Sequence, residues 1–272
     1  MITNVWRRLV RRMITSSSNA QIKNIIALQK KSKARNEQDV FVVEGIKMFS
    51  ELPKDRIVSV FVSESFLNEP EQKALLEGVK YECVSDKVFK EISDTFTPQG
   101  ILAIVKQYHY SFEDLLHNAK GAPMFMVLEE LQDPGNLGTI LRTSEGAGIT
   151  GVILSKGCVD IYNSKVIRST MGTVFRVPFM YTENLPGIIN KIKETCTVYA
   201  AYLKGSRYEY DECDYTKGTA FVIGNEAKGL SSEIAELADE RIIIPMQGQV
   251  ESLNAAVAAS ILMYEGYRQR RQ

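Results

Sequence analysis

Short apolar runs alternate with amphipathic stretches along most of the chain, starting near residue 39. The apolar runs of the first half predict strands at residues 40–43, 57–62, 81–84 and 100–105. The amphipathic stretches between them predict helices at residues 46–52, 71–76 and 87–92. Strands and helices that alternate at this spacing indicate α/β units built on a mainly parallel sheet.

The second half repeats this alternation with a stronger signal. Its predicted strands are residues 124–131, 152–154, 197–203, 220–223 and 242–244, and residues 174–181 are extended. Its predicted helices are residues 137–145, 163–171, 188–194 and 253–268. In the last helix Leu253, Val257 and Ile261 form one stripe, and the many alanines let another backbone approach closely. This face predicts a buried interface, within the fold or with a second subunit.

Residues 18–35 predict a basic helix before the first strand. Ser18 or Asn19 can cap its start. Ile22, Ile25, Ile26 and Gln29 share one face of it.

Composition narrows the class of protein. The 272 residues are 44% hydrophobic, which excludes wholesale disorder, and no apolar run is long enough to span a membrane. Four cysteines without a CxxC pair argue against structural zinc and a disulfide framework, and they fit a reducing cytoplasm. Two histidines cannot build a multi-histidine metal site.

Charge is distributed unevenly, although 33 Lys and Arg balance 33 Asp and Glu. Residues 1–35 hold nine basic residues and no acid, which leaves 24 basic and 33 acidic residues in the remainder. A basic arm on an acidic body favours binding to phosphates. A frayed terminus, a mitochondrial transit peptide, or a true start at Met13 are alternatives for the first dozen residues. The last follows from Met-Ile-Thr recurring at residue 13.

These patterns predict four regions: an extension at 1–17, a first domain at 18–106, a linker at 107–123 and a second domain at 124–272. The linker is more polar than its surroundings and ends in Gly121-Ala122-Pro123.

Candidate chemistry lies in three segments, 128–142, 221–231 and 242–254. In each, a hydrophobic strand runs into a glycine-bearing loop, where open α/β sheets place ligands. Singly, each segment is explained by a turn, a strand end or a helix cap. None is a Walker loop or a GxGxxG fingerprint, so ATP hydrolysis and Rossmann dinucleotide binding lose ground.

Together and in this order, the segments resemble the SpoU (TrmH-type) family of RNA ribose 2′-O-methyltransferases, within the SPOUT superfamily. The matching motifs are Asn136-Leu137-Gly138 with Arg142, then Gly224-Asn225-Glu226 with Gly229-Leu230-Ser231, then Ile244-Pro245-Met246 with Glu251-Ser252-Leu253-Asn254. Residues 41–45 resemble the start of the family's ribosomal-protein-like substrate-binding domain. Ala227 stands where many members have glycine, and Thr170 where many have serine.

The resemblance implies a fold and a cofactor. Residues 18–106 are then an α/β domain that binds RNA, and residues 124–272 are a SPOUT methyltransferase domain with a trefoil knot. The knot implies a pocket for S-adenosylmethionine lined by Gly224, Ile244 and Leu253. Because a side chain at Gly224 should obstruct that pocket, Gly224→Val is expected to abolish cofactor binding and to leave the fold intact.

The resemblance also implies roles in catalysis. Arg142 is expected to grip a phosphate and stabilise charge on the 2′-oxygen, because a guanidinium holds its proton too firmly to act as a base. Asn136 and Ser252 are expected to orient Arg142 or the ribose, with Asn254 beside them. Glu226 is expected to hold a loop N–H or Arg142. The sulfonium donor is already activated, so no metal is expected.

The implied substrate is structured RNA, with rRNA expected over tRNA. Its phosphates are expected to contact five residues of the basic arm, Lys23, Lys30, Lys31, Lys33 and Arg35. The implied assembly is a homodimer, in which Arg142 reaches the partner's pocket. Alternatives are a tRNA substrate, a non-catalytic RNA-binding scaffold, and a nucleotide-dependent oxidoreductase, which the missing dinucleotide fingerprint disfavours.

Overall fold

The structure is a computed structural model that describes residues 13–271, in two compact units. The first unit holds the described residues up to Gln107 together with Tyr162–Ser164, and the second holds Tyr108–Ile161 and the described residues from Lys165 onward. The expectations for residues 1–12 lie outside the described residues.

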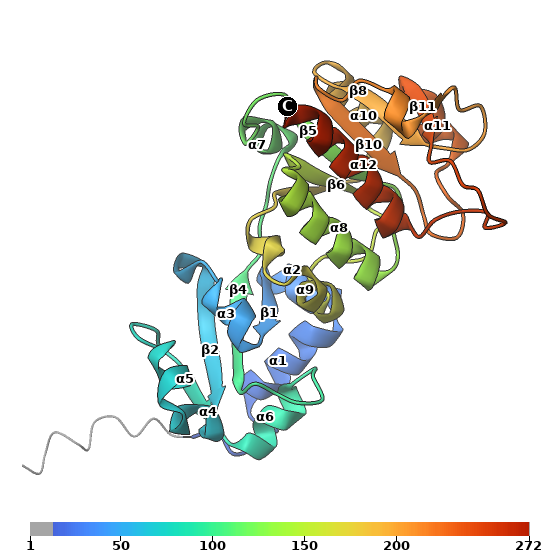
Figure 1. Cartoon of the computed structure of the whole chain (residues 1–272). Coiled ribbons are helices and arrows are strands. Elements are labelled where there is room, and N and C mark those ends of the chain that lie inside the picture. The colour runs from blue at the N-terminus through green and yellow to red at the C-terminus, as the bar shows by residue number, and fades with distance from the viewer. Residues whose placement is uncertain (1–12, 272) are drawn as a thin grey trace, which may run out of the picture. The chain divides into compact units, whose positions relative to one another are not determined.

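The first unit is a four-stranded sheet with helices packed around it (Figure 1). Its strands are β1 (Val40–Glu44), β2 (Ile57–Ser63), β3 (Glu82–Val84) and β4 (Ile101–Lys106). Its helices are α1 (Ala20–Lys30), α2 (Ser32–Gln38), α3 (Ile46–Ser50), α4 (Glu64–Asn68), α5 (Pro70–Ala74) and α6 (Asp86–Ile92). The predicted alternation of strands and helices is confirmed here.

The prediction of a mainly parallel sheet is wrong for this unit. The strand order is β1-β4-β2-β3, and β4 runs antiparallel to both of its neighbours. Only β2 and β3 are parallel. The pattern of apolar residues fixes which segments are strands but carries no information on direction. Here the chain leaves β3 and enters β4 from the same end of the sheet.

The predicted basic helix is two helices. Asn19 caps α1 by accepting from the Gln21 amide at 2.8 Å, and α2 begins after Lys31, whose backbone is extended. The α1 face that carries Ile22 and Ile25 is buried against the sheet, as predicted.

Part of the predicted N-terminal extension belongs to this core. Ile14 is buried and pairs with Val84 along the edge of β3. Its amide donates to the Cys83 carbonyl at 2.9 Å, and its carbonyl accepts from the Ser85 amide at 3.0 Å. The two apolar residues Met13 and Ile14 are too short a run to predict this strand pairing from the sequence.

The second unit is built on a seven-stranded, wholly parallel sheet, which confirms the prediction of a mainly parallel sheet for this half. Its strands are β5 (Met124–Leu128), β6 (Gly151–Ser155), β7 (Phe179–Thr182), β8 (Thr197–Ala201), β9 (Tyr208–Glu209), β10 (Thr219–Ile223) and β11 (Glu240–Ile243), in the order β7-β6-β5-β10-β8-β11-β9. Its helices are α7 (Phe112–His117), α8 (Pro134–Ala147), α9 (Ser164–Thr170, which starts at the unit boundary), α10 (Leu185–Lys193), α11 (Ser232–Leu237) and α12 (Ala255–Arg270).

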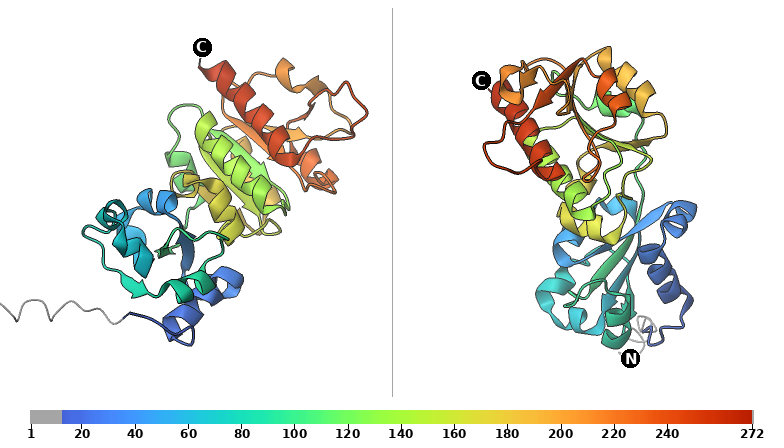
Figure 2. Two further views of the ribbon diagram at one scale, coloured as in Figure 1. Left: turned by 60° about the horizontal axis from the view of Figure 1, so that its bottom comes forward. Right: turned by 90° about the vertical axis from the view of Figure 1, so that its right-hand side faces the viewer.

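Helices cover both faces of this sheet (Figure 2). Phe125 and Val127 point to a core shared with α7, α10 and α11. On the other face α12 packs against α8 and approaches β5 and β10, and a Cβ added at Gly266 would meet the sulfur of Met124 in β5 at 2.7 Å. Successive side chains of β5 point to opposite faces of the sheet, and helices cover both faces. The strand is therefore apolar throughout.

The segment expected as a linker carries α7. Its Phe112 and Leu115 are buried in the second core. Ser111 and Asp114 form a capping box at its start.

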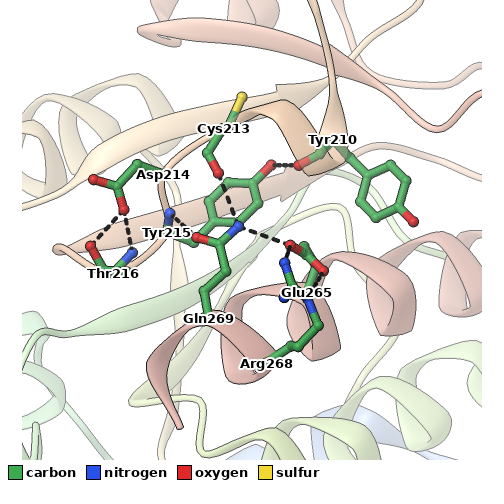
Figure 3. Close-up of polar contacts among 8 residues, drawn as sticks. All are labelled: Tyr210, Cys213, Asp214, Tyr215, Thr216, Glu265, Arg268 and Gln269. Atoms are coloured by element: carbon green, nitrogen blue, oxygen red, sulfur yellow. Dashed lines mark hydrogen bonds and ion pairs between the residues drawn. The ribbon is translucent and has the colours of Figure 1, made fainter. Parts of the chain in front are cut away.

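The end of α12 is tied to the segment before β10 (Figure 3). The Gln269 amide donates to the Cys213 carbonyl at 3.0 Å and accepts from the Tyr215 amide at 2.8 Å. Tyr215 is fully buried and donates its hydroxyl to the Tyr210 carbonyl, while burial raises its pKa. Arg270 donates to four backbone carbonyls, including those of Ala122 and Lys217. These bonds hold the C-terminal end of α12 against the segments that lead into β5 and β10.

No helix within residues 13–271 has the length and apolar character needed to cross a membrane.

Candidate active site

The loops that carry the three motifs follow β5, β10 and β11 at one end of the parallel sheet. β5 and β10 are neighbours, with Leu128 opposite Ile223. The chain continues from β5 to β6 and β7 on one side, whereas β8 and β11 lie on the other side of β10. The junction of β5 and β10 is thus the point where strand order reverses, which is where open α/β sheets bind ligands.

Glu226 links the loop after β10 to the loop after β5. Its carboxylate accepts from the Gln132 amide at 3.0 Å, the Asp133 amide at 2.9 Å and the Asn136 side chain at 2.9 Å. The carboxylate therefore fixes the turn that starts α8. This is the first of the two roles that the sequence leaves open for Glu226, holding a loop N–H.

Glu129 makes the reciprocal link. Its carboxylate accepts from the Ser231 amide at 2.7 Å and from the Ser231 hydroxyl at 2.6 Å. Asn225 adds a third bond, from its side-chain amide to the Glu130 carbonyl at 2.7 Å. Each loop thus holds the other through a carboxylate.

The hydrogen bonds set the charge state of Glu226. Partial burial raises the pKa of this carboxyl, but donation from Gln132, Asn136 and Asp133 outweighs it and leaves the pKa below its usual value. Glu226 is therefore an anion at neutral pH.

Asn136 connects this pair of loops to the third motif. It is buried in the first turn of α8, and its side-chain oxygen accepts from the Asn254 amide at 3.0 Å. Asn254 caps α12 by accepting from the Ala256 and Val257 amides. One chain of hydrogen bonds, Glu226–Asn136–Asn254, thus joins all three motifs.

Gly224 is needed for the fold of its own loop. A Cβ there would lie 2.1 Å from the Leu230 nitrogen and 2.3 Å from the Gly229 carbonyl carbon. The expectation that Gly224→Val leaves the fold intact is therefore wrong, because the side chain would collide with backbone before it reached any ligand.

Arg142 and Ser252 stand apart from this network. Both are exposed, and within residues 13–271 neither side chain has a hydrogen-bond or ion-pair partner. Within a single chain Asn136 bonds Glu226 and Asn254 and does not contact Arg142, so the alternative that it orients the ribose stays a prediction.

The loop between β11 and α12 contrasts with the other two. Ile244 and Leu253 are half-buried at its two ends. Across 244–253, no backbone amide or carbonyl has a partner within the described part of the chain. These groups are available to a ligand.

The first unit presents most of the predicted phosphate contacts. Lys23, Lys30, Lys31 and Lys33 are exposed on α1, α2 and the residue between them. The predicted phosphate contact of Arg35 is wrong. Only 3% of this residue is exposed, and its guanidinium donates to the Leu28 carbonyl at 2.7 Å. It closes the C-terminus of α1 and does not face a phosphate.

Sequence reasoning missed Glu129 and the amides of Gln132 and Asp133. The available signal was a pair of acids, Glu129-Glu130, directly after an apolar strand. No group of three or more metal-ligating side chains occurs within residues 13–271.

Comparison with known proteins gives the site its context. Residues 123–264 match the SpoU rRNA methylase family, and residues 19–103 match the MRM3-like substrate-binding domain. RlmP of Bacillus subtilis, a 23S rRNA (guanosine(2553)-2′-O)-methyltransferase, is 33% identical over 255 residues, which cover 93% of this chain and 98% of RlmP. The human mitochondrial rRNA methyltransferase 3 is 32% identical over 92% of this chain and 73% of its own length. The crystal structure of an AdoMet-bound rRNA methyltransferase from Sinorhizobium meliloti superposes with a TM-score of 0.83 at 30% identity, over 94% of this chain and 97% of that one.

Proposed function

The chain belongs to the SpoU rRNA methylase family, and from this premise we propose that it transfers a methyl group from S-adenosylmethionine to a ribose 2′-hydroxyl of rRNA. The observation that carries the proposal is the Glu226–Asn136–Asn254 chain, which joins the family's three motifs at the strand-order reversal. Relatives that act on rRNA support rRNA over tRNA as the substrate.

The open loop fits the proposed cofactor. The unbonded backbone of 244–253 offers donors and acceptors suited to adenine and to an amino acid, and Ile244 and Leu253 offer apolar contact. Gly224 shapes the neighbouring loop. S-adenosylmethionine supplies an activated methyl group on a sulfonium, so the proposed reaction uses no metal.

The proposed roles divide between positioning and contact. Glu226, Asn136 and Asn254 position the loops and do not face the reacting atoms. Arg142 and Ser252 are the exposed groups that contact RNA, with Arg142 on a phosphate and on the charge that develops at the 2′-oxygen.

We propose a homodimer built on α12. Its exposed side includes Val257, Tyr264 and Tyr267, which form an apolar strip along the helix. In that dimer Arg142, unpartnered in its own described chain, serves the pocket of the other subunit. We also propose the trefoil knot of the family, with α12 threaded through a loop.

The lysines of α1 and α2 would contact RNA phosphate, and the protein would act in the cytoplasm. Its four cysteines are free thiols, two of them buried, which suits a reducing compartment.

Methyl transfer from labelled S-adenosylmethionine tests the proposal. Purified protein is expected to label rRNA, and Arg142→Ala is expected to lower the rate about 100-fold while cofactor affinity stays unchanged. Changing Lys30, Lys31 and Lys33 to Glu should weaken RNA binding and flatten its salt dependence. Labelling of tRNA in place of rRNA would contradict the substrate assignment.

A mixed dimer tests the shared site. One chain carries Arg142→Ala, and the other carries substitutions in 244–253 that abolish cofactor binding and preserve the fold. Two affinity tags isolate the mixed species, which should regain activity because one site pairs an intact Arg142 with an intact pocket. A mixed dimer that is folded and inactive would place Arg142 at its own pocket.

A further inference from the structure

Phe96 is the most exposed aromatic side chain among the described residues. It lies in the loop between α6 and β4, with a relative exposure of 101%. The other phenylalanines of this unit include Phe41 and Phe61, which are buried. A phenylalanine held entirely in water forgoes the stabilisation that burial gives, and both faces of its ring are open to a ligand.

The start of this loop is anchored. The Glu44 carboxylate, at the end of β1, accepts from the Asp94 amide at 2.9 Å and from the Thr95 hydroxyl at 2.9 Å. It also accepts from the Ser93 hydroxyl. Phe96 directly follows this anchored segment, so its backbone has little freedom to fold the ring back onto the protein.

The end of the loop is anchored too. The Gln99 side chain accepts from the Ile46 amide at 2.8 Å, and the Gly100 carbonyl accepts from the Ser63 amide at 2.8 Å. Gly100 has a φ of +78°, and a Cβ there would meet the Ser63 hydroxyl at 2.5 Å. Fixed ends on both sides present the ring on a short, rigid arch.

Cationic side chains flank the base of the arch. Gln29 of α1 donates to the Ile92 carbonyl at 2.6 Å, so α1 and α6 lie side by side there (Figure 1). Lys30, Lys31 and Lys90 are exposed and stand within two residues of that contact, against two exposed acids, Glu91 and Asp94. The surroundings suit a phosphate backbone, as does the acid-free α1.

We propose that Phe96 is a stacking platform for an unpaired base of the RNA substrate, with Lys30 and Lys90 on the adjoining phosphates; this rests on the proposed function. Every base presents a π-face, so a lone exposed ring accepts any base without reading its edge. The rigid arch fixes where the base sits on this unit.

Three variants test the platform: Phe96→Ala, Phe96→Trp, and Val58→Ala as the control. Val58 is an exposed apolar residue of the same unit, at the opposite end of β2 from the arch. Phe96→Ala should weaken binding to rRNA about 5- to 100-fold, whereas Phe96→Trp and Val58→Ala should stay near wild type. In methyl transfer, Phe96→Ala should raise KM for RNA and leave kcat and cofactor affinity unchanged.

A spectroscopic probe reports stacking directly. A single-stranded oligoribonucleotide that carries one 2-aminopurine should lose fluorescence on binding wild type and keep it with Phe96→Ala. Equal RNA affinity and equal quenching for Phe96→Ala would overturn the platform. A fall in melting temperature or a change in oligomeric state would overturn it too, because Phe96 would then pack on protein.

The outcomes separate this inference from the proposed function. If the wild type binds rRNA with Phe96-dependent quenching but transfers no methyl group, the proposed function fails and the platform stands. If it methylates rRNA and Phe96→Ala has an unchanged KM, the platform fails and the proposed function stands.

Discussion

The loop after β10 and the loop after β11 leave the same end of the same sheet, yet they are held in opposite ways. The first forms a small hairpin, Asn225 to Gly229, and is clamped through Glu129 and Glu226. The second has no hydrogen-bonded backbone across 244–253 within the described chain. One half of the site is thus fixed before any ligand arrives, and the other half keeps its donors and acceptors open.

This difference divides the work of the site. A preorganised half holds α8 and α12 in register without rearrangement at the moment of reaction. The backbone of the open half must be ordered when the ligand binds. The entropy lost in this ordering lowers the net affinity for the cofactor.

A pair of glycine substitutions, one in each loop, tests this difference most strongly. Gly224→Ala should destabilise the protein by about 3 kcal/mol or more, because its Cβ would overlap the backbone of Gly229 and Leu230. Gly248→Ala, in the open loop, should cost less than about 0.5 kcal/mol, since a Cβ there has no heavy atom within 4 Å. Denaturant unfolding measures both, and equal losses would contradict the division into a fixed and an open loop.

Glu226→Gln tests the fixed half more gently. The amide keeps the size of the side chain but turns a donor toward the amides of Gln132 and Asp133. Methyl transfer should fall about 10- to 100-fold through misplacement of α8, at a stability cost of about 1 kcal/mol. Glu236→Gln, an acid of the same unit in α11, is the control and should leave both unchanged. A normal rate for Glu226→Gln would show that the clamp is dispensable.

Some features of the fold could be predicted from the sequence, and others could not. The apolar run of β5 and the cap Asn19 follow from local residues, and both were predictable. The direction of β4 could not be predicted, because the spacing of apolar residues is the same whichever way a strand runs. Arg35 was assigned to phosphate because it is basic, whereas its buried guanidinium donates to the Leu28 and Gln29 carbonyls at the end of α1.

The site shows the same limit. Motif order along the chain identified Asn136, Glu226 and Asn254, but the bonds between them join residues 90 and 118 positions apart. Such pairings depend on tertiary packing, and a single sequence does not tell how far apart two loops lie in space.

Cofactor binding should change hydrogen exchange differently in the two loops. S-adenosylmethionine is expected to slow hydrogen exchange at amides within 244–253, where no internal bonds now protect them. Amides of 225–231 should change little, because they are already held. Mass spectrometry of exchanged peptides reads both loops in one experiment. Protection confined to 225–231 would reverse the assignment.

The smallest effect is a pH dependence of stability. Because the pKa of Glu226 is lower in the folded than in the unfolded protein, its bonds contribute stability above the unfolded value of about 4.3. That contribution is lost as pH falls through the folded pKa. Wild type should therefore lose more stability than Glu226→Gln between neutral pH and pH values below about 4. Parallel curves for the two proteins would mean that the carboxylate is not held as described.

The central claim is methyl transfer to a ribose 2′-oxygen, and alkaline digestion of the product RNA tests it most directly. A 2′-O-methyl group blocks the internal attack that cleaves RNA in alkali, so labelled methyl carried from S-adenosylmethionine into rRNA should be recovered in alkali-resistant dinucleotides. The account predicts that wild type yields these dinucleotides and that Arg142→Ala yields almost none. Label recovered only in single nucleotides, on the bases, would contradict it.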